Sequence, residues 1–134
     1  GLKWPNDLVA WREGRLVKLG GILGEQSGGR LILGLGVNLT EAPEIPGRAI
    51  PPACLTELGL KPPAATDLAT HIISLWEGLR QEYQVPFRWP AAGVALQWEE
   101  GQGTCLGWEP DGRLKVATPQ GIRRLSAGDV AGLV

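Results

Sequence analysis

Residues 15–39 read RLVKLGGILGEQSGGRLILGLGVNL, two apolar runs separated by a small polar segment. The glycines between Gln26 and Gly29 are typical of a turn, so the two runs are predicted to be neighbouring strands. The second run, Arg30 to Leu39, is almost continuously apolar, which predicts a central strand covered on both faces. Gly34 and Gly36 within it mark places where another group approaches the backbone closely.

The remaining elements are predicted from turn residues and periodicity. Glu13-Gly14 lies between two short apolar segments, 8–11 and 15–18, as in a β-hairpin. The proline-rich stretch 41–52 is predicted to be a loop, and 53–60 a short helix. A longer helix is predicted over 67–83, with Thr66 as its N-cap, Pro86 beyond its end, and an apolar stripe of Leu68, Ile72, Leu75, Leu79 and Tyr83.

The pattern of apolar and turn residues in the sequence changes at Pro90. From there on, short apolar segments alternate with turn residues such as Asp111-Gly112, at the spacing of hairpins. The predicted strands are 94–98, 104–108, 114–117 and 122–125. We therefore expect an α+β chain whose residues 1–89 form a mixed sheet with helices and whose residues 90–134 form a small β-barrel domain.

Composition narrows the classes of function. The 134 residues carry 13 Lys and Arg against 14 Asp and Glu, a net charge of −1, and 43% are hydrophobic. Near-neutral charge argues against a surface that holds nucleic acid or anionic lipid. No apolar run approaches the roughly 20 residues of a membrane-spanning helix, and two cysteines are too few for a disulfide framework. These features favour a cytoplasmic protein. Because Gly1 stands where an initiator Met is expected and residues 2–5 read as mid-strand, we expect a piece of a longer protein.

Three motifs could carry chemistry. Lys3-Trp4-Pro5-Asn6-Asp7 has the residues of a tight turn, which explains all of them except Trp4. In Lys18-Leu19-Gly20-Gly21-Ile22-Leu23, a cation enters a glycine-rich strand and could lie over an anion, although a solvated lysine beside a flexible segment is the simpler interpretation. In Gly34-Leu35-Gly36-Val37-Asn38, the carboxamide could pair with an adenine edge or could cap the strand end.

Other candidates have simpler interpretations. His71 is predicted to lie on the surface of the long helix, without a metal-binding partner one turn away. Cys54 and Cys105 are predicted to be small buried residues. Three tryptophans are expected to fill the core and a domain interface rather than to stack on bases: Trp89, Trp98 and Trp108.

Taken together and in this order, the three motifs closely resemble those of the biotin protein ligases, or biotin–acetyl-CoA-carboxylase ligases. The resemblance is dense over residues 2–38, loose over 41–65, and resumes in the carboxy-terminal part. It implies a catalytic domain related to class II aminoacyl-tRNA synthetases, followed by an SH3-like barrel. It also implies ATP-dependent activation of biotin to biotinyl-5′-AMP and transfer to a lysine of a biotin carboxyl carrier domain.

The resemblance further implies a role for individual residues. Lys18 would be catalytic, contacting both the biotin carboxylate and the phosphate, and Asn38 would face the adenine. Asn6 would bind at the nucleotide end, and Asp7 would touch Mg²⁺ or its water. Biotin and its adenylate would lie against the backbone at Gly21, Leu23, Gly34 and Gly36. A fixed ammonium suits this chemistry because negative charge builds on the phosphoryl oxygens in the transition state.

The sequence departs from the family pattern at one serious point. The Gly-Arg-Gly-Arg loop that precedes the Lys-Trp-Pro-Asn motif in the family, and holds the adenylate, is absent from the 134 residues. The missing amino-terminal part of the same protein is therefore expected to be a partner of this chain. Two alternatives remain open: a lipoate or octanoate ligase of the same superfamily, and a split or decayed subunit that binds without turnover.

Overall fold

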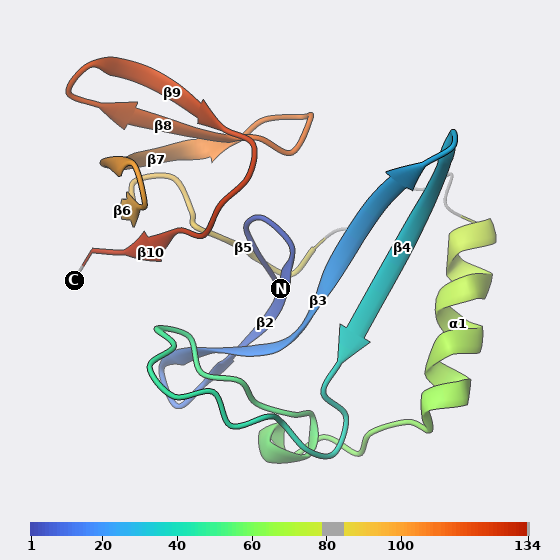
Figure 1. Ribbon diagram of the computed structural model, residues 1–134. Helices are drawn as coiled ribbons and strands as arrows, with labels where there is room; N and C mark the ends of the chain where they lie inside the picture. The colour runs from blue at the N-terminus through green and yellow to red at the C-terminus, as the bar shows by residue number, and fades with distance from the viewer. Residues whose placement is uncertain (79–84, 134) are drawn as a thin grey trace. The chain divides into compact units, whose positions relative to one another are not determined.

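The structure is a computed structural model that describes residues 1–78 and 85–133 (Figure 1). The chain divides into two compact units, one made of residues 1–7 with 87–134 and the other of residues 8–86. The carboxy-terminal unit thus includes the first seven residues, which a boundary at Pro90 does not anticipate. The division into domains 1–89 and 90–134 stays a prediction.

The unit of residues 8–86 begins with three strands. Strand β2 (Asp7–Arg12) leads into β3 (Arg15–Ser27), and β3 into β4 (Arg30–Val37). Glu13 and Gly14 have φ values of 51° and 74°, and Gly28 and Gly29 have 56° and 73°. Positive φ at both central residues gives the tight turns that match the twist of paired strands. Both predicted turns are therefore confirmed, the second as the end of a long hairpin.

The position of β4 differs from the expectation. It lies at one edge of its sheet and pairs only with β3 (Figure 1). Its apolar side chains are exposed, including Leu31 at 64% and Ile32 at 57%. The prediction of a central strand covered on both faces is wrong for the described part of the chain, because β4 is an edge strand whose apolar side chains are exposed. An edge strand of this kind exposes unpaired backbone groups as well as apolar side chains.

The helices follow the sequence more loosely. The predicted short helix is a single 3-10 turn, η1 (Thr56–Leu58), which ends at Gly59 with φ 73°. The longer helix, α1 (Ala65–Glu77), begins after Ala64, so Thr66 is inside its first turn and the prediction that it caps the helix is wrong. Leu79 and Tyr83 of the predicted stripe lie outside the described residues. No helix in the described ranges is long and apolar enough to cross a membrane.

The carboxy-terminal unit contains the four strands predicted from hairpin spacing and two short ones that were missed. A parallel pair forms between β1 (Leu2–Lys3) and β5 (Arg88–Trp89). A separate five-stranded sheet has the order β10-β6-β7-β8-β9, with all neighbours antiparallel (Figure 1). Its strands are β6 (Ala95–Trp98), β7 (Gly101–Trp108), β8 (Leu114–Thr118), β9 (Gly121–Leu125) and β10 (Ala131–Gly132).

This sheet is open among the described strands, since β9 and β10 are its two edges. The mixed α+β class is confirmed. The synthetase-like sheet and the closed SH3-like barrel stay predictions.

The core of the carboxy-terminal unit is built around its sheet. Trp4, from the opening motif, is 1% exposed among these residues. The other buried members are Leu96, Cys105, Leu114, Val116, Leu125 and Val130. Trp89, Trp98 and Trp108 pack against them, which confirms their predicted core role. Burial raises the pKa of the Cys105 thiol, and both cysteines are buried as predicted.

Candidate functional site

The β3–β4 hairpin brings together four of the predicted site residues. In its register Gly21 lies opposite Gly36, and Leu23 lies opposite Gly34. Residues directly opposite each other in an antiparallel pair share a face of the sheet. The four residues therefore form one strip, in which three positions lack a side chain and Leu23 supplies an apolar one.

Two glycines of this strip, Gly34 and Gly36, are not explained by packing among the described residues. A Cβ placed on Gly36 would meet nothing within 4 Å, and one on Gly34 would come no closer than 3.8 Å to its neighbours. By contrast, a Cβ on Gly20 would overlap the carbonyl of Gly36, so Gly20 is required for the close approach of β3 to β4. The open space over Gly34 and Gly36 is consistent with a ligand lying against bare backbone.

The backbone of Lys18 is held in place by hydrogen bonds to the segment 51–53. Its N–H donates to the carbonyl of Pro51 (2.9 Å), and its carbonyl accepts from the N–H of Ala53 (2.8 Å). The next carbonyl, of Leu19, accepts from the N–H of Asn38 (2.7 Å). The side chain of Asn38 in turn donates to the carbonyl of Ala53. The backbone of Lys18 and Leu19 is therefore tied both to the segment 51–53 and to the end of β4.

Asn38 is the residue that joins the end of β4 to the segment 51–55. Its Nδ2 donates to the carbonyl of Ala53 (3.0 Å), and its own carbonyl accepts from the N–H of Leu55 (3.1 Å). The interpretation that Asn38 caps the end of the strand is thus correct in part, because one N–H of its carboxamide makes a hydrogen bond within the fold. The same contacts hold the carboxamide in one orientation, next to the segment that binds the Lys18 backbone.

Glu57 supports this arrangement and was missed in the sequence. Its Oε2 accepts from the N–H of Cys54 (2.8 Å), and its Oε1 pairs with Arg12 (3.2 Å). The Cys54 N–H, followed by Arg12, holds the pKa of the Glu57 carboxyl below its ordinary value. A glutamate in the first turn of η1 that accepts from an N–H three residues earlier resembles half of a capping box, and this is the signal that could have identified it.

The Lys-Trp-Pro-Asn-Asp motif lies in the other unit and is anchored by its first two residues. Trp4 Nε1 donates to the carbonyl of Gly112 (3.0 Å) in the turn between β7 and β8. Lys3 is 3% exposed, and its Nζ lies 2.5 Å from Asp129 Oδ1 and 4.0 Å from Asp7 Oδ2. Asn6 is exposed and Asp7 is half-buried. The structure therefore explains Trp4, the one residue that turn chemistry leaves unexplained.

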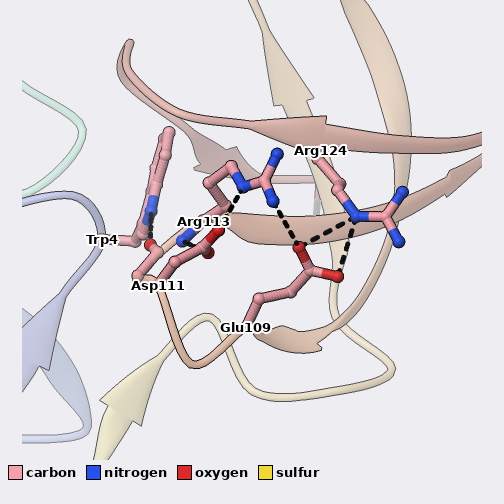
Figure 2. A network of polar contacts seen from close by, with 6 residues as sticks. Trp4, Glu109, Asp111, Arg113 and Arg124 are labelled. Atoms are coloured by element: carbon pink, nitrogen blue, oxygen red, sulfur yellow. Dashed lines mark hydrogen bonds and ion pairs between the residues drawn. The ribbon is translucent and has the colours of Figure 1, made fainter.

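A charged cluster surrounds the turn to which Trp4 is bonded (Figure 2). Arg124 Nε donates to both carboxylate oxygens of Glu109 at 2.9 Å, and Arg113 Nε donates to Asp111 (2.7 Å). The pKa of the Asp111 carboxyl is lowered, mainly by the hydrogen bond that it accepts from the backbone N–H of Arg113. Because both guanidinium groups are paired with carboxylates, we infer that this cluster stabilises the turn and does not bind a ligand.

The described residues do not form a metal site by themselves. In the ranges 1–78 and 85–133, no three His, Cys, Asp or Glu side chains gather as metal ligands. The Asp7 carboxylate faces the Lys3 ammonium instead. Mg²⁺ is usually held by one or two carboxylates together with substrate phosphates, so we derive no step through a resident metal. His71 is exposed on α1, as predicted.

A hollow of about 690 Å³ is lined by residues of 40–46 and 51–57, the second of which also binds the backbone of Lys18. Three carboxylates line it: Glu41, Glu44 and Glu57. Negative charge of this density disfavours a carboxylate or phosphate ligand. The glycine strip of the hairpin is therefore the better candidate for binding an acid or a nucleotide.

Comparison with known proteins gives a consistent set of relatives. No family model matches this sequence. Over 74 residues, 54% of the chain, it is 42% identical to the biotin–[acetyl-CoA-carboxylase] ligase of Mycobacterium tuberculosis. That match spans 25% of the relative, so most of the relative lies outside it.

Solved structures extend the likeness to nearly the whole fold. The apo biotin protein ligase of Aquifex aeolicus matches 97% of this chain and 64% of its own, with a TM-score of 0.68 and 24% identity. A variant of that ligase in complex with biotin matches with a TM-score of 0.64 and 26% identity, over 98% of this chain and 60% of its own. The same ligase in complex with biotin and ATP matches over 98% and 60%, with a TM-score of 0.63 and 23% identity. In sequence over 74 residues and in fold over almost its full length, this chain is similar to the biotin protein ligases.

Proposed function

We propose that this chain is the carboxy-terminal portion of a biotin protein ligase. Its protein would use ATP to convert biotin to biotinyl-5′-AMP and would then transfer the biotinyl group to a lysine of a biotin carboxyl carrier domain. The observation that carries this proposal is the β3–β4 strip, in which Gly21 faces Gly36 and Leu23 faces Gly34. The same fold occurs in a ligase described with biotin and ATP.

The strip has the chemistry that biotin needs. The bare backbone at Gly34 and Gly36 can lie against a flat ligand, and Leu23 offers an apolar contact to its rings. Lys18, at the entrance of the same strand, supplies the cation. In the first step the biotin carboxylate attacks the α-phosphate of ATP and pyrophosphate leaves. In the second, the carrier lysine attacks the acyl carbon of the mixed anhydride and AMP leaves.

The proposal includes the finer features of fold and partners. Residues 1–89 would complete a synthetase-like mixed sheet together with an amino-terminal segment, and residues 90–134 would form the SH3-like barrel. Asn6 and Asp7 would lie at the nucleotide end, where Mg²⁺ arrives with ATP. The protein would be cytoplasmic, and its macromolecular partner would be the carrier domain of acetyl-CoA carboxylase or a related carboxylase.

The reaction is tested with the full-length protein, meaning this chain together with the amino-terminal segment predicted to precede it. We expect exchange of labelled pyrophosphate into ATP that requires biotin and is not supported by lipoate or octanoate. Exchange driven by lipoate or octanoate would identify the related ligase instead. A protein that binds biotin without any exchange would favour a non-catalytic subunit.

A second expectation concerns Asn38. If its carboxamide faces adenine, Asn38→Asp should raise the KM for ATP about tenfold, since a carboxylate cannot donate a hydrogen bond to the ring nitrogen. Initial rates at varied ATP measure this, with thermal unfolding recorded in parallel. Asn38→Asp and Asn38→Ala variants that use ATP normally but melt earlier would make the residue structural only.

A further inference from the structure

The peptide group between Ala53 and Cys54 is held at both of its ends. Each of these residues is 1% exposed, so the donor and the acceptor of this peptide group need partners within the fold. Its carbonyl, of Ala53, accepts from Asn38 Nδ2 (3.0 Å), and its N–H, of Cys54, donates to Glu57 Oε2 (2.8 Å). Because a peptide group is planar and rigid, a contact that fixes its N–H also fixes the direction of its carbonyl.

The Glu57 carboxylate is fixed by a second contact. Its Oε1 lies 3.2 Å from Nη1 of Arg12, at the end of β2. The two side chains are 42% and 38% exposed, so this ion pair orders the carboxylate and adds little stability. The hydrogen bond from the Cys54 N–H lowers the pKa of the Glu57 carboxyl, and an ionised acceptor makes a stronger hydrogen bond than a neutral one. The contacts thus run from Arg12 through Glu57 and one peptide group to Asn38.

The backbone of Asn38 does not depend on this series of contacts. Its N–H donates to the carbonyl of Leu19 (2.7 Å), and its carbonyl accepts from the N–H of Leu55 (3.1 Å). Removal of the Glu57 carboxylate should therefore leave the end of β4 in place and release only the Asn38 side chain.

On the basis of the proposed function, in which the Asn38 carboxamide faces adenine, we propose that Glu57 is a positioning residue for nucleotide selection. Glu57 holds the peptide group whose carbonyl binds the carboxamide nitrogen, and this determines where the carboxamide presents its oxygen. Adenine has an amino group where guanine has a carbonyl oxygen. A carboxamide that is held in one orientation accepts from adenine and repels guanine, whereas a released one can turn over and donate to guanine.

The experiment removes the acceptor and compares two nucleotides in the full-length protein. Glu57→Ala deletes the carboxylate, and Glu57→Gln keeps an oxygen that can accept from the Cys54 N–H. The matched control is Glu44→Ala, because Glu44 is an exposed carboxylate that lines the same hollow as Glu57. Biotin-dependent pyrophosphate exchange is measured at varied ATP, varied GTP and varied biotin, at a temperature where thermal unfolding shows every variant to be folded.

We expect Glu57→Ala to raise the KM for ATP about fivefold, the effect of one hydrogen bond, and to lower the preference for ATP over GTP about tenfold. The KM for biotin and kcat should change by less than about twofold, because Lys18 keeps its hydrogen bond to Pro51. Glu57→Gln should retain most of the preference for ATP, and Glu44→Ala should behave like the unaltered protein.

A double variant tests whether Glu57 acts through Asn38. In a protein that already carries Asn38→Ala, Glu57→Ala should raise the KM for ATP no further, because the carboxamide that it positions is gone. A residue that only stabilises the fold would add its full effect in both backgrounds. Additive effects of the two substitutions would therefore overturn the positioning role.

The remaining outcomes separate this inference from the proposed function. If the unaltered protein shows no biotin-dependent exchange, the proposed function fails and the inference fails with it. If the unaltered protein is active but uses ATP and GTP equally, or if Glu57→Ala keeps the full preference for ATP, only the inference is overturned. Loss of the preference in Glu57→Gln would also overturn it, since a neutral oxygen at that position can accept the same hydrogen bond.

Discussion

Replacing Lys18 with alanine in the full-length protein is expected to slow biotin adenylation by about two orders of magnitude. One donor aimed at developing negative charge contributes about 3 kcal/mol to the transition state. The backbone of Lys18 is fixed by Pro51 and Ala53, so little reorganisation is needed when the phosphate arrives. Biotin binding should weaken less than the rate falls, because the charge on the phosphoryl oxygens is greatest in the transition state.

Biotin-dependent pyrophosphate exchange measures the rate, and calorimetric titration measures biotin binding. Lys61→Ala is the control, since Lys61 is an exposed lysine of the same unit outside the hairpin. Exchange at the unaltered rate in Lys18→Ala would remove this residue from the catalytic machinery.

The second large effect is expected when residues 1–134 are studied alone. We expect this chain to form no biotinyl-AMP and to label no carrier domain, and to associate with itself. Strand β4 exposes Leu31, Ile32, Leu33 and Leu35 on an unpaired edge, and such an edge favours pairing with another chain. Adding the predicted amino-terminal segment, fused or in trans, should restore both steps and reduce self-association.

Streptavidin blotting of a carrier domain, with ATP, Mg²⁺ and biotin, measures the labelling, and gel filtration measures the association. The Lys18→Ala chain mixed with the same segment is the control, because its labelling should stay strongly reduced. Clear ATP-dependent labelling by residues 1–134 alone would contradict the prediction. The work of the absent Gly-Arg-Gly-Arg loop would then be done by residues within the chain.

Local chemistry made several elements predictable. The turns at Glu13-Gly14 and Gly28-Gly29 need backbone angles that glycine adopts readily, and short apolar segments between turn residues predicted the strands of the carboxy-terminal sheet. The motifs on β3 and β4 were found as separate pieces of sequence. Their pairing across the hairpin follows from the turn, since its position sets the register that places Gly21 opposite Gly36.

Long-range contacts decided what the sequence left open. Gly20 and Gly36 look alike in sequence, yet only Gly20 is required by the close approach of the two strands. The apolar run of β4 indicates burial, but whether a strand is buried depends on what lies over it, and the described residues leave it exposed. The helix begins two residues before the predicted position, because cap preference locates a helix end only to within one or two residues.

The sequence by itself determined the hairpins, the mixed α+β class and the motifs that resemble those of the biotin protein ligases, because each depends on residues near one another in the chain. Only the tertiary structure decided that Lys3 and Trp4 are buried. Their partners, Asp129 and Gly112, lie more than one hundred residues away, and a turn motif contains no information about such distant groups. Burial is a property of the assembled fold, so a lysine that the sequence places in a tight turn becomes a buried link between the opening motif and the carboxy-terminal sheet.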